Sequence, residues 1–444
     1  MTPPPRPGPE APPTATATGP DSARGQRARR LWGSSLIRQN ILYLIGIGGS
    51  GAGVLIAQSY AAHHLTAVEN GESFSVVAVL NLLYTISFVV NAGAAREVAA
   101  TVARGVPAIQ RWADLRYSTV RIGLALGAIM IPVDFLLAFL LHLPHPEVLA
   151  TTVVAGPLSA FTGVQRGYLQ GTRDFRRLAA NFLIYGGTVV VLSVVLLHLR
   201  LGSAAVPVAT VGGVLGSSLY PRHPGAHLER AAAAHGHLID YTVVAGAATA
   251  PLFNNVDVVV ARHVLPGGSA GLYSGLSVMG KIIFFGTSSL SAVMYPRLAA
   301  AATASARRRL LLQTLVALCA ADGVALVAYG FFAKPLLRLV LGAQYVGDSV
   351  HLLLFTVGVI GLTFVNLMVY YGMGTHSRHF AIVPAIGVPA LLAWLFASPP
   401  QLSAFVPRIA SALLVLAVLE TVLVLPGALR RGDRVSEAPP GGIP

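Results

Sequence analysis

Apolar runs of about 18–25 residues recur along this whole chain, and each is long enough to cross a bilayer as a helix. Lipid offers no partner to a backbone N–H or C=O, so only helices and closed barrels span membranes. Barrel strands would be about ten residues long and would alternate in polarity, whereas these runs do not alternate. Of the 444 residues, 54% are hydrophobic and only 11% are charged, which is too apolar for a soluble domain. The sequence therefore predicts an all-α polytopic membrane protein.

We count about twelve transmembrane helices, with Gly-rich 203–220 the weakest and 379–397 expected to kink at its prolines. The predicted spans are 36–62, 74–98, 118–141, 148–170, 178–199, 203–220, 239–263, 270–295, 309–333, 348–374, 379–397 and 403–426.

The distribution of basic residues orients these spans. With the N-terminus inside, most of the 31 lysines and arginines fall on the inner side, Arg166 among them. The outer segments hold only Arg200, Arg262, Lys334 and Arg338. This bias is typical of cytoplasmic loops, so the net charge of +14 is explained by topology and by anionic membrane lipids, not by nucleic acid. We expect a multi-pass protein of a bacterial plasma membrane with both termini in the cytoplasm.

The chain is predicted to divide into two six-helix bundles, residues 36–220 and 239–426, joined by a cytoplasmic linker at 221–238. Tails at 1–35 and 427–444 are expected to be cytoplasmic. The first is expected to be disordered, because its Pro, Ala and Thr residues offer little apolar surface to bury.

The two predicted bundles show signs of an internal repeat. At an offset of 200, Gly71 matches Gly271 and Asn81 falls on Lys281. A second similarity, between the segments YLQGT and YGMGT, lies at nearly the same offset. Both bundles begin inside, so the repeat is parallel, about an axis along the membrane normal. Transporters are commonly built in this way, with the substrate site between the halves.

Short motifs between the spans resemble those of a known superfamily. The segments RGYLQGTRDF, NNVDVVVARHVLPGGSAGLYSGLSVMGKIIFFGTSSLSAVMYPRLA and LVLGAQYVGDS are similar to the multidrug/oligosaccharidyl-lipid/polysaccharide exporter superfamily, and the last of them to its polysaccharide-flippase branch. The resemblance covers roughly residues 36–426.

The resemblance implies a flippase that moves lipid-linked oligosaccharide or polysaccharide precursors across the cytoplasmic membrane by alternating access. Two six-helix bundles would enclose a central cavity. The substrate would be a glycan on a polyprenyl phosphate or diphosphate carrier, for cell-surface polysaccharide biosynthesis. Glycan-assembly enzymes are possible partners.

Charged and amide side chains inside apolar spans are the candidate site. They are costly in lipid and usually face a bundle interior or a wet cavity. Lys281 would offer a positive charge to a phosphate or an acidic sugar, while Asp257, Asn254 and Asn255 would tune it and bind hydroxyl groups. A structural ion pair between Lys281 and Asp257 is the alternative.

The first bundle is expected to line the opposite side of the cavity. Its candidate cavity residues are Asn40, Gln58, Asn81 and Asn91, although an isolated asparagine is more often a link between helices. Arg38 at the cytoplasmic mouth either meets a phosphate or only sets topology.

Two further acids, Asp134 and Asp322, are candidates for ion coupling, with inert protonated carboxyls as the alternative. No cofactor and no metal site are expected. The linker histidines at 223–237 have no Cys or carboxylate cluster beside them, so a solvated linker is favoured.

Three other classes stay open. A drug or cation antiporter of the same superfamily would need a committed acidic ion site, which the scattered acids do not show. A membrane glycosyltransferase or polymerase would need outward-facing catalytic groups, yet the outer loops are short. A scaffold without catalytic activity is the fourth reading. We therefore do not expect an enzyme.

Overall fold

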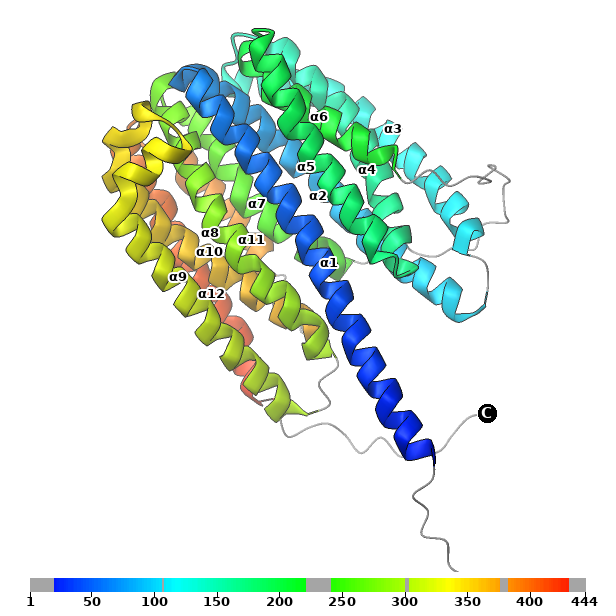
Figure 1. Ribbon diagram of the computed structural model, residues 1–444. Helices are drawn as coiled ribbons and strands as arrows, with labels where there is room; N and C mark the ends of the chain where they lie inside the picture. The colour runs from blue at the N-terminus through cyan, green and yellow to red at the C-terminus, as the bar shows by residue number, and fades with distance from the viewer. Residues whose placement is uncertain (1–19, 106–107, 221–240, 300–302, 376–381, 431–444) are drawn as a thin grey trace, which may run out of the picture. The chain divides into compact units, whose positions relative to one another are not determined.

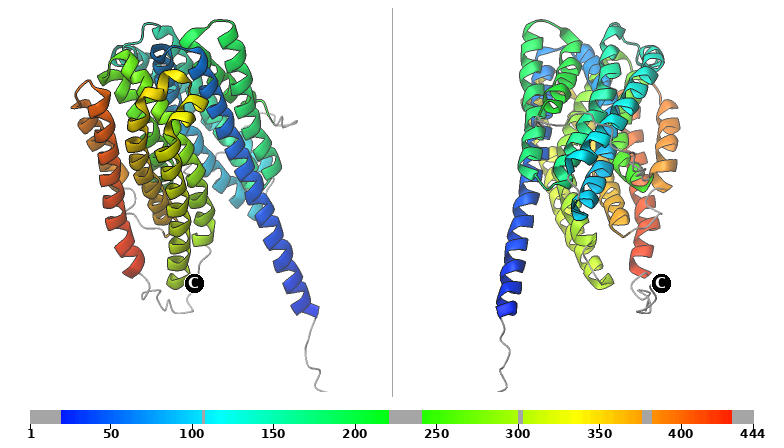
Figure 2. Two further views of the ribbon diagram at one scale, coloured as in Figure 1. Left: turned by 60° about the vertical axis from the view of Figure 1, so that its left-hand side comes forward. Right: turned by 90° about the vertical axis from the view of Figure 1, so that its right-hand side faces the viewer.

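The computed structural model describes residues 20–105, 108–220, 241–299, 303–375 and 382–430, and these residues form helices and turns without a strand (Figure 1). Two further views show the same helices from other sides (Figure 2). The α-helices are α1 (Pro20–His64), α2 (Ala67–Ala103), α3 (Ala108–Leu141), α4 (Ala150–Gly171), α5 (Phe175–His198), α6 (Ala205–Ser218), α7 (Tyr241–Val264), α8 (Gly267–Ala299), α9 (Ala304–Val340), α10 (Ser349–Gly374), α11 (Ile382–Phe396) and α12 (Leu402–Arg430). The short 3₁₀ helices are η1 (Pro146–Leu149), η2 (Gly202–Ala204) and η3 (Ala343–Asp348).

Each predicted span falls on one of these helices, so the all-α fold with twelve helices is confirmed for the described residues. The chain divides into two compact units, Met1–Ile41 and Leu42–Pro444. The first unit contains the start of α1. The predicted division into two bundles with a linker and tails stays a prediction, and the linker histidines lie outside the described residues.

The first helix begins earlier than predicted. The sequence predicts a disordered tail up to residue 35, whereas α1 starts at Pro20. Residues 21–31 are rich in Ala and Arg, which favour helix even where no apolar face needs burial.

Many helices carry apolar side chains on their outer surfaces. Among the described residues, eight helical segments are long and apolar enough to cross a membrane. Phe135 and Phe139 on α3 and Phe331 on α9 are each at least 75% exposed in the isolated chain. Large aromatic side chains left so exposed indicate contact with lipid, because water would make them costly. The chain is therefore a multi-pass membrane protein.

The ninth helix continues past its predicted end. The sequence predicts that it stops at residue 333, which places Lys334 and Arg338 in an outer loop. The structure instead places both on α9, which runs to Val340. Phe332 has non-helical angles of φ −117° and ψ 21°, three residues before Pro335. Proline clashes with the preceding turn and lacks an N–H, so α9 kinks at this point and then resumes.

Helix α4 packs directly on the backbone of α2. Gly163, Gly167 and Gly171 lie on one face of α4 at a spacing of four residues. A Cβ atom at Gly163 would lie 2.6 Å from the carbonyl oxygen of Ser87, and one at Gly167 would lie 2.7 Å from that of Asn91. Small residues permit such close approach between membrane helices. This contact sets which α2 side chains reach α4.

A second close contact joins α2 to α8. A Cβ atom at Gly71 would lie 2.8 Å from the Cα of Gly271, so the two glycines that match in the repeat touch each other. The helices α2 and α8 begin at Ala67 and Gly267, again 200 residues apart. This contact supports the predicted repeat and brings α2 against the second half of the chain.

Polar contacts reinforce this end of the molecule, which we call the hairpin end because α1 turns into α2 there and α7 into α8. Asn70 Nδ2 donates to the Tyr345 hydroxyl over 2.5 Å. Gln344 Nε2 donates to the carbonyl oxygens of Ala62 and Leu65 over 2.9 and 3.1 Å. These bonds tie the α1–α2 turn to η3 in the second half.

Gly271→Ala is predicted to destabilise the protein by about 3 kcal/mol or more, because overpacking a close contact costs roughly that much. The new Cβ atom would lie 1.7 Å from the carbonyl oxygen of Ala67, so the backbone must shift. The measurement is the unfolding midpoint in detergent. Gly286→Ala on the same helix is the control, since its Cβ atom meets nothing within 4 Å. Equal midpoints for the two variants would contradict the proposed contact.

Candidate functional site

Three predicted residues meet where α2 contacts α7 and α8. The side-chain oxygen of Asn255 accepts a hydrogen bond from Asn81 Nδ2 over 3.2 Å and another from Lys281 Nζ over 3.3 Å. The amide nitrogen of Asn255 donates to the Pro251 carbonyl oxygen over 2.8 Å, which fixes the orientation of the amide. We call Asn81, Asn255 and Lys281 the amide cluster. It joins α2 in the first half to α7 and α8 in the second.

Asp257 lies on the same helix as Asn255 but has a different partner. It is 4% exposed, and the Tyr273 hydroxyl donates to its Oδ2 over 2.6 Å. Its Oδ1 has no hydrogen-bond partner among the described residues. Among the described residues Asp257 is hydrogen-bonded to Tyr273 and Lys281 to Asn255, and the choice between a substrate site and a structural ion pair stays a prediction.

Within the described residues Gln58 and Asn91 are not joined to the amide cluster by hydrogen bonds. Asn254 is buried beside Asn255, and Gln58 and Asn91 are buried at other levels of α1 and α2. Asn91 Oδ1 lacks a partner there as well. The side chains of Arg38 and Asn40 lie outside the described residues.

The two candidate coupling acids are each bound by a threonine. The Thr152 hydroxyl donates to Asp134 over 2.6 Å, between α4 and α3. The Thr363 hydroxyl donates to Asp322 over 2.8 Å, between α10 and α9. Asp322 is buried, and its second oxygen has no partner in the described part of the chain. Each of these acids therefore lies between two helices of one half, apart from the amide cluster.

Arg166 is the main departure from the predicted site. The sequence places it with the inner, topology-setting arginines, but it lies on α4 and is 1% exposed. Its Nε donates to Asn181 Oδ1 over 2.7 Å, and its Nη1 donates to the Tyr84 hydroxyl. The guanidinium carbon lies 4.0 Å from the centroid of the Phe182 ring and 5.9 Å from that of Tyr185.

This environment replaces water with aromatic faces and neutral acceptors. Cation–π contacts stabilise a desolvated guanidinium, but among the described residues no carboxylate pairs with Arg166. Its Nη2 atom has no hydrogen-bond partner there either. A buried cation without a counter-charge is costly, so Arg166 leaves an unused positive charge inside the first half.

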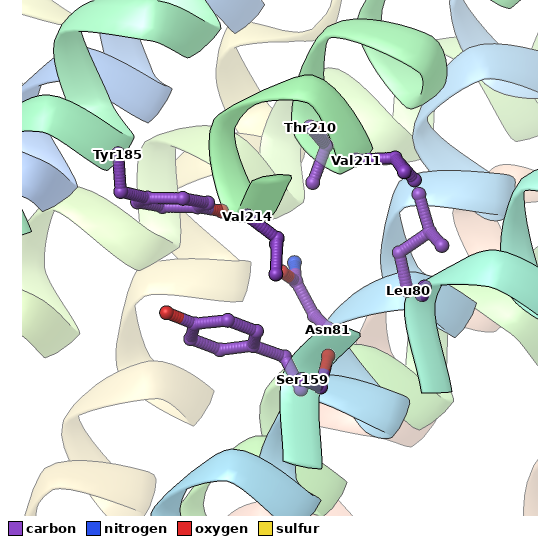
Figure 3. Close-up of a pocket in the computed structure, with 9 residues that line it drawn as sticks. Leu80, Asn81, Ser159, Tyr185, Thr210, Val211 and Val214 are labelled. Carbon is purple, nitrogen blue, oxygen red and sulfur yellow. The ribbon is translucent and has the colours of Figure 1, made fainter. Parts of the chain in front are cut away.

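A small pocket separates the amide cluster from the aromatic rings around Arg166. It has a volume of ≈ 10 Å³, about enough for one water molecule. Asn81 and Ser159 point toward it from α2 and α4, and Tyr185 and Thr210 from α5 and α6 (Figure 3). Tyr84, which binds Arg166, also lines it. Polar groups therefore continue along one turn of α2, from Asn81 at the amide cluster to Tyr84 at Arg166.

Sequence reasoning missed Arg166, Asn181, Tyr185 and Tyr273. Counting charges by loop treats an arginine near a helix end as a topology residue. The available signal was the spacing around it, since Gly163, Gly167 and Gly171 mark the packed face of α4. An arginine between such glycines lies in a protein interface.

The arrangement has a clear chemical preference. Two cations, Lys281 and Arg166, retain donors that the described residues do not use, and amide and hydroxyl groups lie between them. Such a set binds anionic groups by charge-assisted hydrogen bonds and sugar hydroxyls by neutral ones. Among the described residues no group of three or more His, Cys, Asp or Glu side chains forms a metal site.

The comparisons with known proteins identify the fold. No protein-family profile matches the chain, and no curated protein sequence matches it. Solved structures of membrane transporters do match. One is the inward-facing conformation of a multidrug resistance MATE family transporter of the MOP superfamily, with a TM-score of 0.65, 13% identity, and coverage of 89% of this chain and 96% of that one.

The outward-facing conformation of a multidrug resistance MATE family transporter of the MOP superfamily matches with a TM-score of 0.61 and 13% identity, over 89% of this chain and 95% of that one. A MATE structure in complex with MaD3S gives 0.64 at 13% identity, over 89% and 96% of the two chains. The chain thus has a MATE-like fold, that of MOP-superfamily transporters. This confirms the fold that the sequence motifs predicted. The polysaccharide-flippase branch stays a prediction.

Tyr84→Phe is predicted to destabilise the protein by about 1–3 kcal/mol, the usual cost of leaving a buried donor unsatisfied. The change keeps the ring but removes the acceptor of Arg166 Nη1. Chemical unfolding in detergent measures the effect, and Tyr117→Phe on the exposed face of α3 is the matched control. If Tyr84→Phe were as stable as the control, the hydroxyl would not hold Arg166.

Proposed function

We propose that this chain is a flippase that moves lipid-linked oligosaccharide or polysaccharide precursors across the cytoplasmic membrane by alternating access. The sugar and phosphate headgroup would cross between the two halves while the polyprenyl tail stays in lipid. Its partners would be the glycan carrier lipid, the surrounding membrane lipids and the enzymes that assemble the glycan. The chain would act as a transporter without enzyme activity.

The amide cluster carries this proposal. It lies where α2 meets α7 and α8, so its hydrogen bonds must change when the two halves move apart. It combines one cation with two amides, which suits an anionic headgroup rich in hydroxyl groups. The carboxylate of Asp257 accepts a hydrogen bond from Tyr273, while Lys281 donates to Asn255.

Arg166 also favours an anionic substrate. It lies on the other side of Tyr84 from the amide cluster and has an unpartnered Nη2 among the described residues. With Lys281 it makes this part of the membrane region positive. A positive interior attracts an anionic headgroup and disfavours a cationic drug.

A drug or cation antiporter is the second candidate, and the buried acid Asp322 is the observation that favours it. A carboxylate with a threonine donor and one free oxygen is a suitable proton site. The matching solved structures also include transporters described as multidrug resistance proteins. In the flippase proposal Asp322 and Asp134 would instead serve ion coupling.

Lys281→Ala is predicted to reduce flipping of a fluorescent polyprenyl-diphosphate oligosaccharide in proteoliposomes by about tenfold or more, equivalent to one lost charge-assisted hydrogen bond. Asp257→Ala is expected to have a smaller effect, since Asp257 contacts Tyr273 and not Lys281. Lys334→Ala is the matched control, because Lys334 is exposed on α9.

Three outcomes separate the candidates. Flipping by the parent and by Lys334→Ala, with loss in Lys281→Ala, supports both the function and the site. If all variants flip the lipid, the flippase proposal stands, but Lys281 is not part of the substrate site. If the parent does not flip the lipid but exports a cationic dye in exchange for protons, the antiporter proposal is correct.

A further inference from the structure

A larger pocket lies at the hairpin end, away from the amide cluster. It has a volume of ≈ 440 Å³ and is formed where the end of α3 meets the α7–α8 turn and α2. The residues that line it are Glu72, His142, Pro144, Arg262, Leu265, Pro266 and Gly267. Among them, the side chains that carry or can gain charge are those of Glu72, His142 and Arg262.

Arg262 is the central group of this pocket. It is 7% exposed, its Nε donates to the Leu141 carbonyl oxygen over 3.1 Å, and its Nη2 lies 3.4 Å from both Glu72 Oε1 and the His142 carbonyl oxygen. Its Nη1 atom is buried and has no acceptor among the described residues. A buried charged donor without an acceptor is costly, so an acceptor bound at this nitrogen would be stabilising.

The unpartnered nitrogen faces the N-terminus of α8. A Cβ atom built on Gly267, the first residue of that helix, would lie 3.5 Å from Arg262 Nη1. N–H groups in the first turn of a helix have no partner within it, and they carry the positive end of the helix dipole. The first turn of α8 therefore lies beside Arg262 Nη1, with the Val68 side chain also 3.5 Å from this Cβ position.

The matching helix of the first half is closed at this position. The Thr66 hydroxyl accepts from the Glu69 N–H over 3.3 Å, and the Glu69 carboxylate accepts from the Thr66 N–H over 2.9 Å, which caps α2. At the same offset α8 has Pro266 and Ser269. Proline has no side-chain acceptor, so Pro266 cannot cap the α8 N–H groups beside Arg262 as Thr66 caps α2.

We propose that this pocket binds a phosphate-type oxyanion between Arg262 Nη1 and the N-terminus of α8. The anion would supply the acceptor that both sets of donors lack, and Glu72 would keep its contact with Nη2. The ligand is either free phosphate or the phosphate of a lipid headgroup, since their recognised chemistry is the same. The site is separate from the amide cluster and does not depend on which solute crosses the membrane.

Gly267→Ala tests the site, with Gly286→Ala on the same helix as its matched control. A methyl group on Gly267 would lie beside Nη1 at ordinary contact distance, whereas one on Gly286 meets nothing within 4 Å. The measurement is calorimetric titration of the full-length protein in detergent with inorganic phosphate. We expect saturable binding that weakens about tenfold in Gly267→Ala, as for one lost charge-assisted hydrogen bond, and is unchanged in Gly286→Ala. Absence of saturable binding by the parent, or equal affinities of the two variants, would overturn the proposal.

Nanodiscs distinguish the two sources of phosphate. The same titration is repeated in discs of zwitterionic phosphatidylcholine and of anionic phosphatidylglycerol. Phosphate binding that persists in both discs assigns the site to free phosphate. If phosphate binds in phosphatidylcholine discs but not in phosphatidylglycerol discs, and neither variant binds phosphate in the latter, an anionic lipid headgroup already occupies the site. No binding in either disc after binding in detergent would overturn the assignment to a site of the membrane-embedded protein.

Discussion

The structure depends on the close backbone contacts of α2 with its neighbours. Glycines remove the side chains that would otherwise separate α2 from α4 at Gly163 and Gly167, and from α8 at Gly271. In lipid, helices gain little from the hydrophobic effect, so packing and hydrogen bonds between them must hold the bundle together. These contacts bring polar groups on α2 to both halves of the chain. Asn81 thereby meets Asn255, and Tyr84 meets Arg166.

The charged groups follow a consistent pattern around this helix. Lys281 and Arg166 are bound by neutral acceptors, while the carboxyls of Asp257, Asp322 and Asp134 are each bound by a hydroxyl group. Among these five residues no cation is hydrogen-bonded to a carboxylate, whereas Arg262 and Glu72 do form an ion pair at the hairpin end. A protein that only needed stability would gain more from pairing them or from apolar substitutes. Cations beside amides are consistent with the proposed path for an anionic, hydroxylated solute.

The fold was predictable because span length and the repeat are properties of the apolar pattern. The twelve helices and the match of Gly71 with Gly271 both follow from the sequence. The contact between those two glycines supports the predicted repeat. The site was predictable only in part. Asn255 and Lys281 stand out as polar residues in apolar runs, but which partner each one takes depends on helix rotation. Arg166 was missed because its distance from a helix end does not show whether its side chain is buried. Counting residues along the chain likewise did not predict that α9 kinks at Phe332 and then continues.

The central claim is that the amide cluster lines the path of a lipid-linked headgroup. The chain has one native cysteine, Cys319, so Asn81→Cys in a Cys319→Ser background reports on this position alone. The measurement is the rate at which a charged, water-soluble thiol reagent labels that cysteine in proteoliposomes, with and without a polyprenyl-diphosphate oligosaccharide. We predict labelling that the glycolipid slows strongly and that an equal amount of polyprenol does not slow. Absence of labelling, or labelling unaffected by the glycolipid, would contradict the claim.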